Sequence, residues 1–280
     1  MREIVAKKIT TAIKDLFLDA NTNLPEEVLD ALNKALAKER SANARDILRQ
    51  LIQNASIAWR DKMPLCQDTG FAIVFAQIGQ DVHIDLGNFN DAVNEGVRQA
   101  YQDGYFRKSI VSDPISRVNT CDNTPAIIHT EIVPGENIKL SIIAKGGGAE
   151  NCSAIKIFKP TSTMEEIDEF ILETIKKAQA NPCPPIIVGI GIGGTFDYAP
   201  ILAKKALMRK LGQHHSAKDI AKWEKELLEK INQTGIGPMG LGGTTTALGV
   251  NIERYACHIS SLPVAINIDC HSHRFKETTI

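Results

Sequence analysis

The chain has 280 residues, six cysteines and a formal net charge of −1. A charge this close to zero gives no general electrostatic attraction to nucleic acid or to an anionic membrane, so neither is an expected partner. No apolar run reaches the roughly 20 residues that span a bilayer, and the first residues lack the apolar core of a signal peptide. We therefore expect a cytoplasmic protein whose thiols stay reduced.

The first sixty residues favour packing helices. Apolar residues recur at helix spacing from Ile4 to Phe17. Pro25, followed by two acids, is typical of a helix start, and a third helix is expected over about residues 42–60. No chemistry is evident in these segments. We expect them to form a helical N-terminal part, about residues 1–60.

The remaining elements alternate between strands and helices. Apolar stretches at 126–133 and 137–144, joined by a Pro-Gly-Glu sequence, predict a hairpin. Further strands are predicted at 71–76, 184–189, 247–259 and 263–268, and further helices at 89–102, 163–180, 200–211 and 217–233. The pattern predicts an α+β fold in which the N-terminal helices pack on a mixed sheet with hairpins. No clear linker interrupts it, so we expect one catalytic domain over residues 1–280.

A polar break at residues 64–70, with the sequence PLCQDTG, separates the predicted third helix from the strand that follows. A thiolate at Cys66 could bind a metal or attack a substrate, and Asp68 beside it could move protons. Gln, Asp, Thr and Gly are also ordinary turn residues, so a turn without chemistry is the alternative.

Three glycine-rich segments, at 146–148, 189–194 and 235–243, adjoin predicted strands. The second matches G-x-G-x-x-G, but the helix, strand and acidic residue that a dinucleotide site requires do not follow it. Exposed amides in three such loops favour binding of an anionic substrate, whereas each loop alone could be a simple turn.

Three cysteines share one setting, because Cys66, Cys183 and Cys270 each lie where an apolar strand meets a polar segment. Three thiolates from distant points could hold zinc together with a histidine, or an iron–sulfur cluster with one iron open. His258 could pair with a carboxylate as an acid–base unit, or serve only a structural role.

Taken in order, these motifs resemble a known family. The segments PLCQDTG at 64–70, KGGG at 145–148, NPCPP at 181–185, the glycine run at 189–194 with Thr195, and the terminal Asp269-Cys270 are similar to those of the iron–sulfur hydro-lyases. This family includes class I fumarate hydratase and the similar L(+)-tartrate dehydratase. The resemblance extends from about residue 5 to the end of the chain.

The resemblance implies a [4Fe–4S] cluster held by Cys66, Cys183 and Cys270, with the fourth iron free for substrate. Cys152 matches no ligand position of the family.

The resemblance also implies the remaining site residues. Gln67 and Asp68 would face the substrate, and Asp68 with His258 would transfer a proton. Arg107 and the backbone amide of Gly147 would bind the substrate carboxylates.

Many family members carry a second domain that supplies further active-site residues. This sequence resembles instead the alpha subunit of the two-subunit form. The implied partner is a beta subunit that completes the site, in a heterotetramer of two alpha and two beta chains.

The expected reaction is the reversible hydration of fumarate, a small dicarboxylate, to L-malate. Dehydration of L(+)-tartrate to oxaloacetate in the same framework is the nearest alternative. The others are a non-catalytic regulatory subunit and a zinc protein that is not a hydro-lyase, whose candidate ligands are Cys257, His258, Cys270, His271 and His273.

Overall fold

The computed structural model describes residues 1–280, which divide into two compact units. Unit 1 comprises Met1–Pro25, Ala55–Gly147 and Arg274–Ile280, and unit 2 comprises Glu26–Asn54 and Gly148–His273. Each unit is thus assembled from separated stretches of the chain. One catalytic domain over 1–280 stays a prediction. No helix in the structure is both long enough and apolar enough to cross a membrane.

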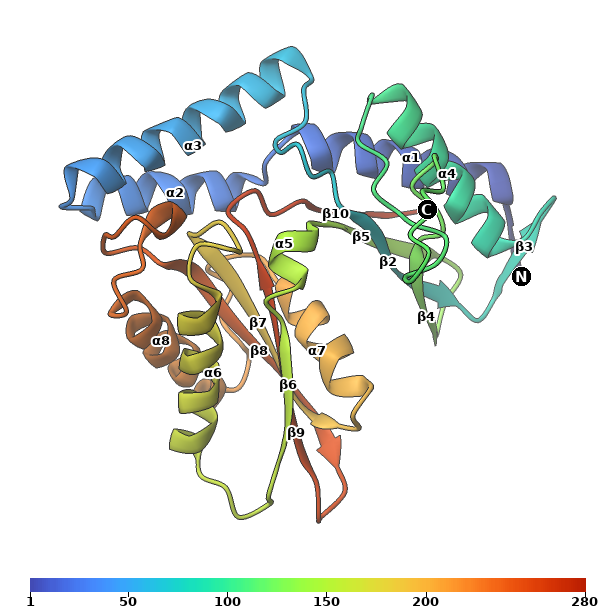
Figure 1. Ribbon diagram of the computed structural model, residues 1–280. Coiled ribbons are helices and arrows are strands. Elements are labelled where there is room, and N and C mark those ends of the chain that lie inside the picture. The colour runs from blue at the N-terminus through green and yellow to red at the C-terminus, as the bar shows by residue number, and fades with distance from the viewer. The chain divides into compact units, whose positions relative to one another are not determined.

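Unit 1 contains a four-stranded sheet, two packed helices and a two-stranded sheet (Figure 1). Its elements are β1 (Arg2–Val5), α1 (Ala6–Thr22), β2 (Phe71–Gly79), β3 (Val82–Asp85), α4 (Phe89–Asp103), β4 (Ile127–Val133), β5 (Ile138–Lys145) and β10 (Phe275–Thr279). Strand β1 pairs with β3 in parallel, and the larger sheet has the order β10-β5-β2-β4.

Helices α1 and α4 bury their apolar stripes against this sheet. Ile9, Ile13 and Phe17 recur at helix spacing on α1, and each is fully buried in one core with residues of α4, β2 and β5. Burying each such side chain stabilises the unit by about 1.5–3 kcal/mol relative to exposing it. This core anchors the strand ends that carry the candidate site.

The predicted hairpin at 126–144 is wrong. Strands β4 and β5 form where expected, but β2 lies between them, parallel to β4 and antiparallel to β5. The physical reason is burial: β2 is almost continuously buried from Ala72 to Ala76, whereas much of β4 is exposed. An apolar strand is stabilised at the centre of a sheet and a more polar one at its edge.

Unit 2 contains the second four-stranded sheet, with the order β6-β9-β7-β8. Its elements are α2 (Glu26–Lys38), α5 (Gly147–Glu150), β6 (Ala154–Phe158), α6 (Met164–Ala178), β7 (Ile186–Gly194), α7 (Tyr198–Leu207), α8 (Lys218–Asn232), η1 (Pro238–Gly240), β8 (Ala247–Cys257) and β9 (Leu262–Asp269). Helix α3 (Ala42–Asp61) belongs partly to each unit. The same is true of α5, whose first residue, Gly147, belongs to unit 1.

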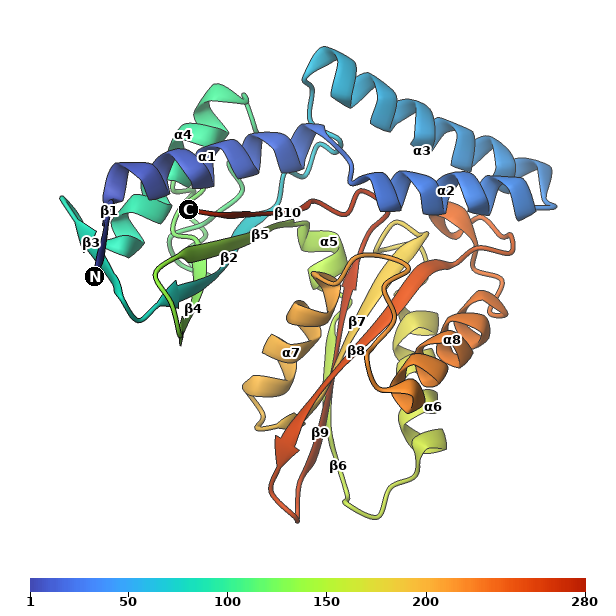
Figure 2. The same ribbon diagram turned by 180° about the vertical axis from the view of Figure 1, so that it is seen from behind.

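Three layers make up the body of unit 2. Helices α6 and α8 cover one face of the sheet, and α7 covers the other, as Figures 1 and 2 show from opposite sides. Helix α6 begins at Thr163, whose side chain forms a reciprocal capping box with Glu166. The α+β fold class and the helical N-terminal part are confirmed.

The glycine run at 189–194 is part of strand β7 and not a loop, which corrects the sequence prediction. A Cβ atom on Gly189 would lie 2.2 Å from the carbonyl oxygen of Ala203, and one on Gly191 would lie 2.1 Å from that of Ala199. Both carbonyls belong to α7. These glycines therefore let the helix backbone rest directly on the strand, so packing explains the motif without any bound anion.

Candidate active site

Side chains from elsewhere in unit 1 donate hydrogen bonds to the backbone carbonyls of the turn at residues 66–70. The buried guanidinium of Arg274 donates from Nη1 to the carbonyl of Asp68. The hydroxyl of Tyr101 donates to the carbonyls of Thr69 (2.6 Å) and Gly70 (2.9 Å). Because successive carbonyls are bound, the turn presents its side chains in fixed directions.

Two backbone amides bind the Asp68 carboxylate. The N–H of Gly70 donates to Oδ1 (3.0 Å), and the N–H of Gly147 donates to Oδ2 (2.8 Å). Strand pairing explains the second bond: Phe71 at the start of β2 lies opposite Lys145 at the end of antiparallel β5. A carboxylate has about four acceptor positions, so Asp68 keeps lone pairs that can take a proton.

The loop that carries Arg107 is attached to the same turn. The hydroxyl of Thr69 donates to the carbonyl of Arg107 (2.8 Å). Asn123, fully buried, accepts from the N–H of Ser109 (2.8 Å) and donates to the carbonyl of Gly70 (3.1 Å). The Arg107 side chain itself is exposed. Its guanidinium is therefore free to reach a ligand while its backbone is tethered.

Unit 1 therefore brings together five of the predicted site residues. These are Cys66, Gln67, Asp68, Arg107 and Gly147. The half-buried thiol of Cys66 donates to the exposed side-chain carbonyl of Gln67 at 3.3 Å.

Tyr101 and Arg274 support the turn and were missed at the level of sequence. Burial raises the pKa of Tyr101 far above its usual value, although the nearby Arg274 charge opposes this, so the phenol stays protonated and donates. Tyr101 lies on the buried stripe of α4, where its pattern resembles ordinary core packing. Only its carbonyl partners reveal its role.

Cys183 and Cys270 lie at one end of the unit 2 sheet. Strands β7 and β9 are antiparallel, with Ile187 opposite Asp269, so the start of β7 adjoins the end of β9. A hydrogen bond of 2.9 Å joins Nδ1 of His271 to the carbonyl of Cys183. Cys183 is left-handed (φ 54°), a conformation that costs a non-glycine residue about 1–3 kcal/mol and is enriched at functional sites.

The donor set suits a thiolate-bound metal centre, since soft sulfur ligands select iron–sulfur clusters and zinc. None of the six cysteines forms a disulfide bond. Cys183 and Cys270 belong to unit 2 and Cys66 to unit 1. No three His, Cys, Asp or Glu residues form a group that could hold a metal ion. The three-cysteine ligand set therefore stays a prediction.

His258 lies at the other end of the unit 2 sheet. Strand β8 runs parallel to β7, with Cys257 opposite Gly194, so His258 follows the end that is distant from Cys183. Nine strand residues separate these ends, a length of about 30 Å. The exposed imidazole contacts Ser260 Oγ (2.7 Å from Nδ1) and lines a cavity of about 490 Å³ with Asp197 and Tyr198.

The same topology separates the candidate zinc ligands. Cys257 and His258 precede β9, whereas Cys270, His271 and His273 follow it, so the length of the strand lies between the two groups. His273 instead pairs with Asp269 (2.6 Å), with both side chains buried. A zinc site that combines Cys257 or His258 with Cys270, His271 or His273 is therefore incompatible with the fold.

The threonine-rich loop before β8 has a structural explanation. Both oxygens of the Glu39 side chain accept hydrogen bonds: Oε2 from the N–H (2.8 Å) and hydroxyl (3.0 Å) of Thr244, and Oε1 from the N–H groups of Arg40 (2.8 Å) and Ser41 (3.0 Å). Glu39 is almost fully buried. It therefore attaches this loop to the segment between α2 and α3.

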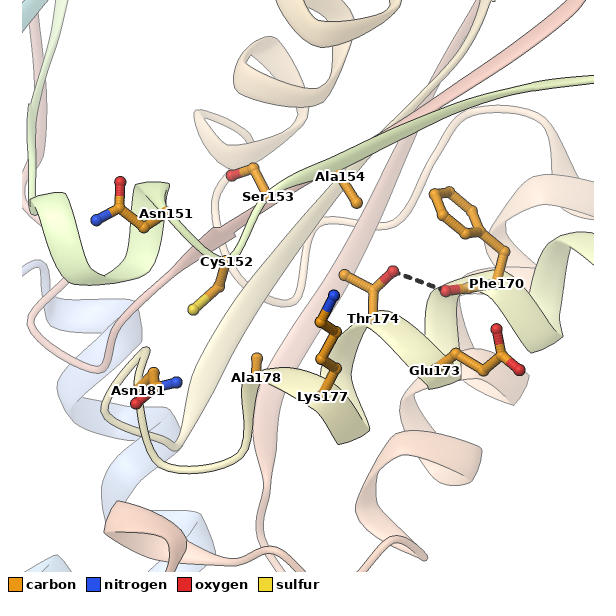
Figure 3. A pocket seen from close by; sticks show the side chains of 10 residues that line it. All are labelled: Asn151, Cys152, Ser153, Ala154, Phe170, Glu173, Thr174, Lys177, Ala178 and Asn181. Atoms are coloured by element: carbon orange, nitrogen blue, oxygen red, sulfur yellow. Dashed lines mark hydrogen bonds between the residues drawn. The ribbon is translucent and has the colours of Figure 1, made fainter.

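A further pocket of about 400 Å³ lies between α6 and the loop before β6 (Figure 3). Figure 3 shows the Cys152 side chain directed toward Asn181, with Lys177 extending from α6 into the same space. The Cys152 thiol donates to the carbonyl of Gly148 at 3.3 Å. No predicted site residue lines this pocket, so Cys152 provides a matched control for the three candidate ligands.

With this arrangement in view, the comparison with known sequences identifies the class of protein. The sequence pattern of the family described as Fumarate hydratase (Fumerase) matches residues 10–279. The chain belongs to this family, which makes it a member of a hydro-lyase family. The predicted resemblance is thus confirmed at the level of the family.

Individual relatives carry a more specific name. One from Methanocaldococcus jannaschii, named "Putative L(+)-tartrate dehydratase subunit alpha", is 46% identical over 273 residues, which cover 95% of each chain. The L(+)-tartrate dehydratase subunit alpha of Escherichia coli strain UTI89 is 30% identical over 277 residues, covering 98% of this chain and 91% of the relative. The similarity therefore extends over both units.

Proposed function

We propose that this chain is the alpha subunit of an iron–sulfur hydro-lyase that interconverts fumarate and L-malate. The observation that carries the proposal is the Asp68 carboxylate, held by the amides of Gly70 and Gly147 and two residues from the Cys66 thiol. Asp68 would thus act as a proton carrier beside a candidate metal ligand on the same turn. A beta subunit would complete the site, in an assembly of two alpha and two beta chains.

Cys66, Cys183 and Cys270 would hold a [4Fe–4S] cluster. This assignment is supported because none of the three is in a disulfide bond and because Cys183 and Cys270 lie at the same end of the unit 2 sheet. When bound, the cluster supplies a Lewis-acidic iron that polarises the hydroxyl that is added or lost.

Side chains of unit 1 would bind the substrate and exchange the proton of the hydroxyl, and a base of the beta subunit would exchange the proton at C3. The exposed Arg107 guanidinium would bind one substrate carboxylate in a bidentate manner, and Gln67 would orient the substrate through its amide. Asp68 would exchange a proton with the hydroxyl at a carboxylate oxygen. The N–H of Gly147 is donated to Asp68 in this structure, so its contact with a substrate carboxylate would require that bond to be shared or broken.

His258 fits the proposal only if a second copy of the chain provides it. Cys183 and His258 lie at opposite ends of the same rigid sheet, about 30 Å apart. A proton relay needs contact, directly or through one water. We therefore pair Asp68 of one copy with His258 of another.

Mixing two inactive variants tests this arrangement. Chains with Asp68→Asn and chains with His258→Ala, unfolded and reassembled together, would form some sites with both residues intact. In a random dimer about a quarter of all sites would be intact, and activity would return to that extent. No recovery from demonstrably mixed assemblies would place His258 outside the site.

Tartrate is the alternative substrate, and the names of the relatives favour it. The purified assembly should be assayed with fumarate, L-malate and L(+)-tartrate under anaerobic conditions. A higher kcat/KM for L-malate and fumarate supports our proposal. Preference for tartrate would replace it with the tartrate dehydratase assignment, while retaining the site.

Metal analysis tests the cofactor independently of substrate. We expect iron and acid-labile sulfide in about equal amounts, close to four of each per chain, after anaerobic purification. Zinc without sulfide would contradict the cluster. The variant Asp68→Asn should keep the iron and lose turnover, whereas loss of both would make Asp68 structural.

A further inference from the structure

Arg274 is a deeply buried cation that contacts the candidate site. Its side chain is 2% exposed, and no carboxylate lies within ion-pair distance of it. Nη1 donates to the carbonyl of Asp68 and to Asn21 Oδ1 (3.4 Å), while Nε has no hydrogen-bond partner. A buried, unpaired charge is costly, so a fold that keeps one is expected to gain something from its position.

The surroundings of the guanidinium leave room for it beside Asp68. A Cβ atom on Gly146 would lie 3.2 Å from Nη2 of Arg274 and 3.5 Å from Oδ2 of Asp68. Glycine at 146 therefore leaves space for both groups. The next residue, Gly147, donates its N–H to the same carboxylate. One short segment thus accommodates the guanidinium and binds the carboxylate.

We propose that Arg274 is a positioning residue for Asp68, and this rests on the proton-transfer role proposed for Asp68. The carboxylate is bound at Oδ1 and Oδ2, and the guanidinium binds the carbonyl of the same residue. Three attachments on one residue fix both its backbone and the direction of its carboxylate. Arg274 thereby aims the remaining lone pairs of Asp68 without touching the substrate.

Lysine cannot reproduce these contacts of the guanidinium. Arginine carries a planar fork of donors, whereas lysine ends in a single ammonium group on a flexible stem. Misplacement of a catalytic group by about 1 Å can reduce rate by about 100-fold. We expect Arg274→Lys to lower kcat by about 10- to 100-fold, with KM and iron content nearly unchanged.

A double-mutant cycle with Asp68→Asn separates positioning from general structural damage. If Arg274 acts through Asp68, Arg274→Lys causes little further loss of kcat once Asp68 is replaced. Persistence of the full loss in the Asp68→Asn background would overturn the proposal. Arg209→Lys is the control in unit 2, because Arg209 also donates to a backbone carbonyl, that of Ile252 (2.9 Å), although it pairs with Glu224 and Glu253 as well.

Amide hydrogen exchange gives a readout that needs no activity. Arg274→Lys should increase exchange at Gly70 and Gly147, the two amides that bind Asp68, whereas Arg209→Lys should not. If Arg274→Lys does not fold, Gly146→Ala is used in its place, because the added Cβ would lie 3.2 Å from Nη2 of Arg274 and displace the guanidinium. Unchanged exchange at both amides would overturn the proposed positioning role of Arg274. A different outcome would reject the proposed function alone: the wild-type chain is inactive on every dicarboxylate, yet exchange at Gly70 and Gly147 still increases in Arg274→Lys.

Discussion

The carboxylate of Asp68 accepts a hydrogen bond from the backbone N–H of Gly147, 79 positions further along the chain, at 2.8 Å. Antiparallel pairing of β2 with β5 brings the two residues together. The bond connects the cysteine turn to the glycine segment, two motifs that the sequence shows only as separate features.

Removing that N–H tests the bond directly. Gly147→Pro deletes the donor to the half-buried carboxylate of Asp68, which costs up to about 1–3 kcal/mol, the range for a fully buried acceptor. We expect kcat to fall about 10-fold or more with iron content retained. Gly147→Ala is the control: its added Cβ would lie 3.7 Å from Asp68 Oδ2, an ordinary contact, and the N–H remains. Equal losses in both variants would show that the space, and not the N–H, matters.

The cysteines divide into proposed ligands and controls. Serine in place of Cys66, Cys183 or Cys270 should remove most of the iron and sulfide, because the thiolate is lost. Cys152→Ser should leave both unchanged, although Cys152 is half-buried like Cys66 and Cys183. Iron and acid-labile sulfide per chain, measured anaerobically, decide the matter. If Cys152→Ser loses iron and one of the other three variants keeps it, Cys152 is a ligand and that other cysteine is not.

Glu39 predicts a pH-dependent stability. Burial alone would raise the pKa of Glu39, but hydrogen bonds from Ser41, Thr244 and Arg40 outweigh it and hold the pKa below its ordinary value of 4.5. A lowered folded-state pKa contributes stability above the unfolded value, and this contribution is lost as pH falls through the folded value.

Glu39→Gln should therefore destabilise unit 2 by about 2 kcal/mol at pH 7. The difference in the free energy of unfolding between Glu39→Gln and wild type should become smaller as the pH drops below the ordinary carboxyl pKa. Urea unfolding across this range measures it, with the exposed Glu229→Gln as control. A difference that stays constant with pH would show that the charge of Glu39 plays no part.

The glycines of β7 predict a packing effect on stability. Gly189→Ala would place a Cβ 2.2 Å from a backbone oxygen of α7, which cannot move without shifting the helix. Such overpacking typically costs about 1–3 kcal/mol. The control is Gly212→Ala, where nothing lies within 4 Å and only the left-handed backbone (φ 86°) opposes the change. Thermal unfolding should rank Gly189→Ala as clearly the less stable, and the opposite ranking would contradict the packing explanation.

Local features of the fold were predictable because their causes are local. The capping box at Thr163 and the apolar stripe of α1 depend on residues three or four positions apart. The proposed roles of Cys66 and Asp68 also start from local sequence, since a thiol and a carboxylate share one short turn, and they stay predictions. The sequence by itself thus determined the types of the longer elements, the α+β class and the family.

Only the tertiary structure decided which distant segments meet. Strand β2 separates the two strands of the predicted hairpin, because partner choice follows burial across the whole sheet. The direction of β7 and β8 places His258 away from Cys183, and the packing of α7 explains Gly189. Arg274 resembles an ordinary polar residue near the end of the chain, yet it is buried against the carbonyl of Asp68. Contacts across such sequence separations depend on the folded chain as a whole, so no short motif could reveal them.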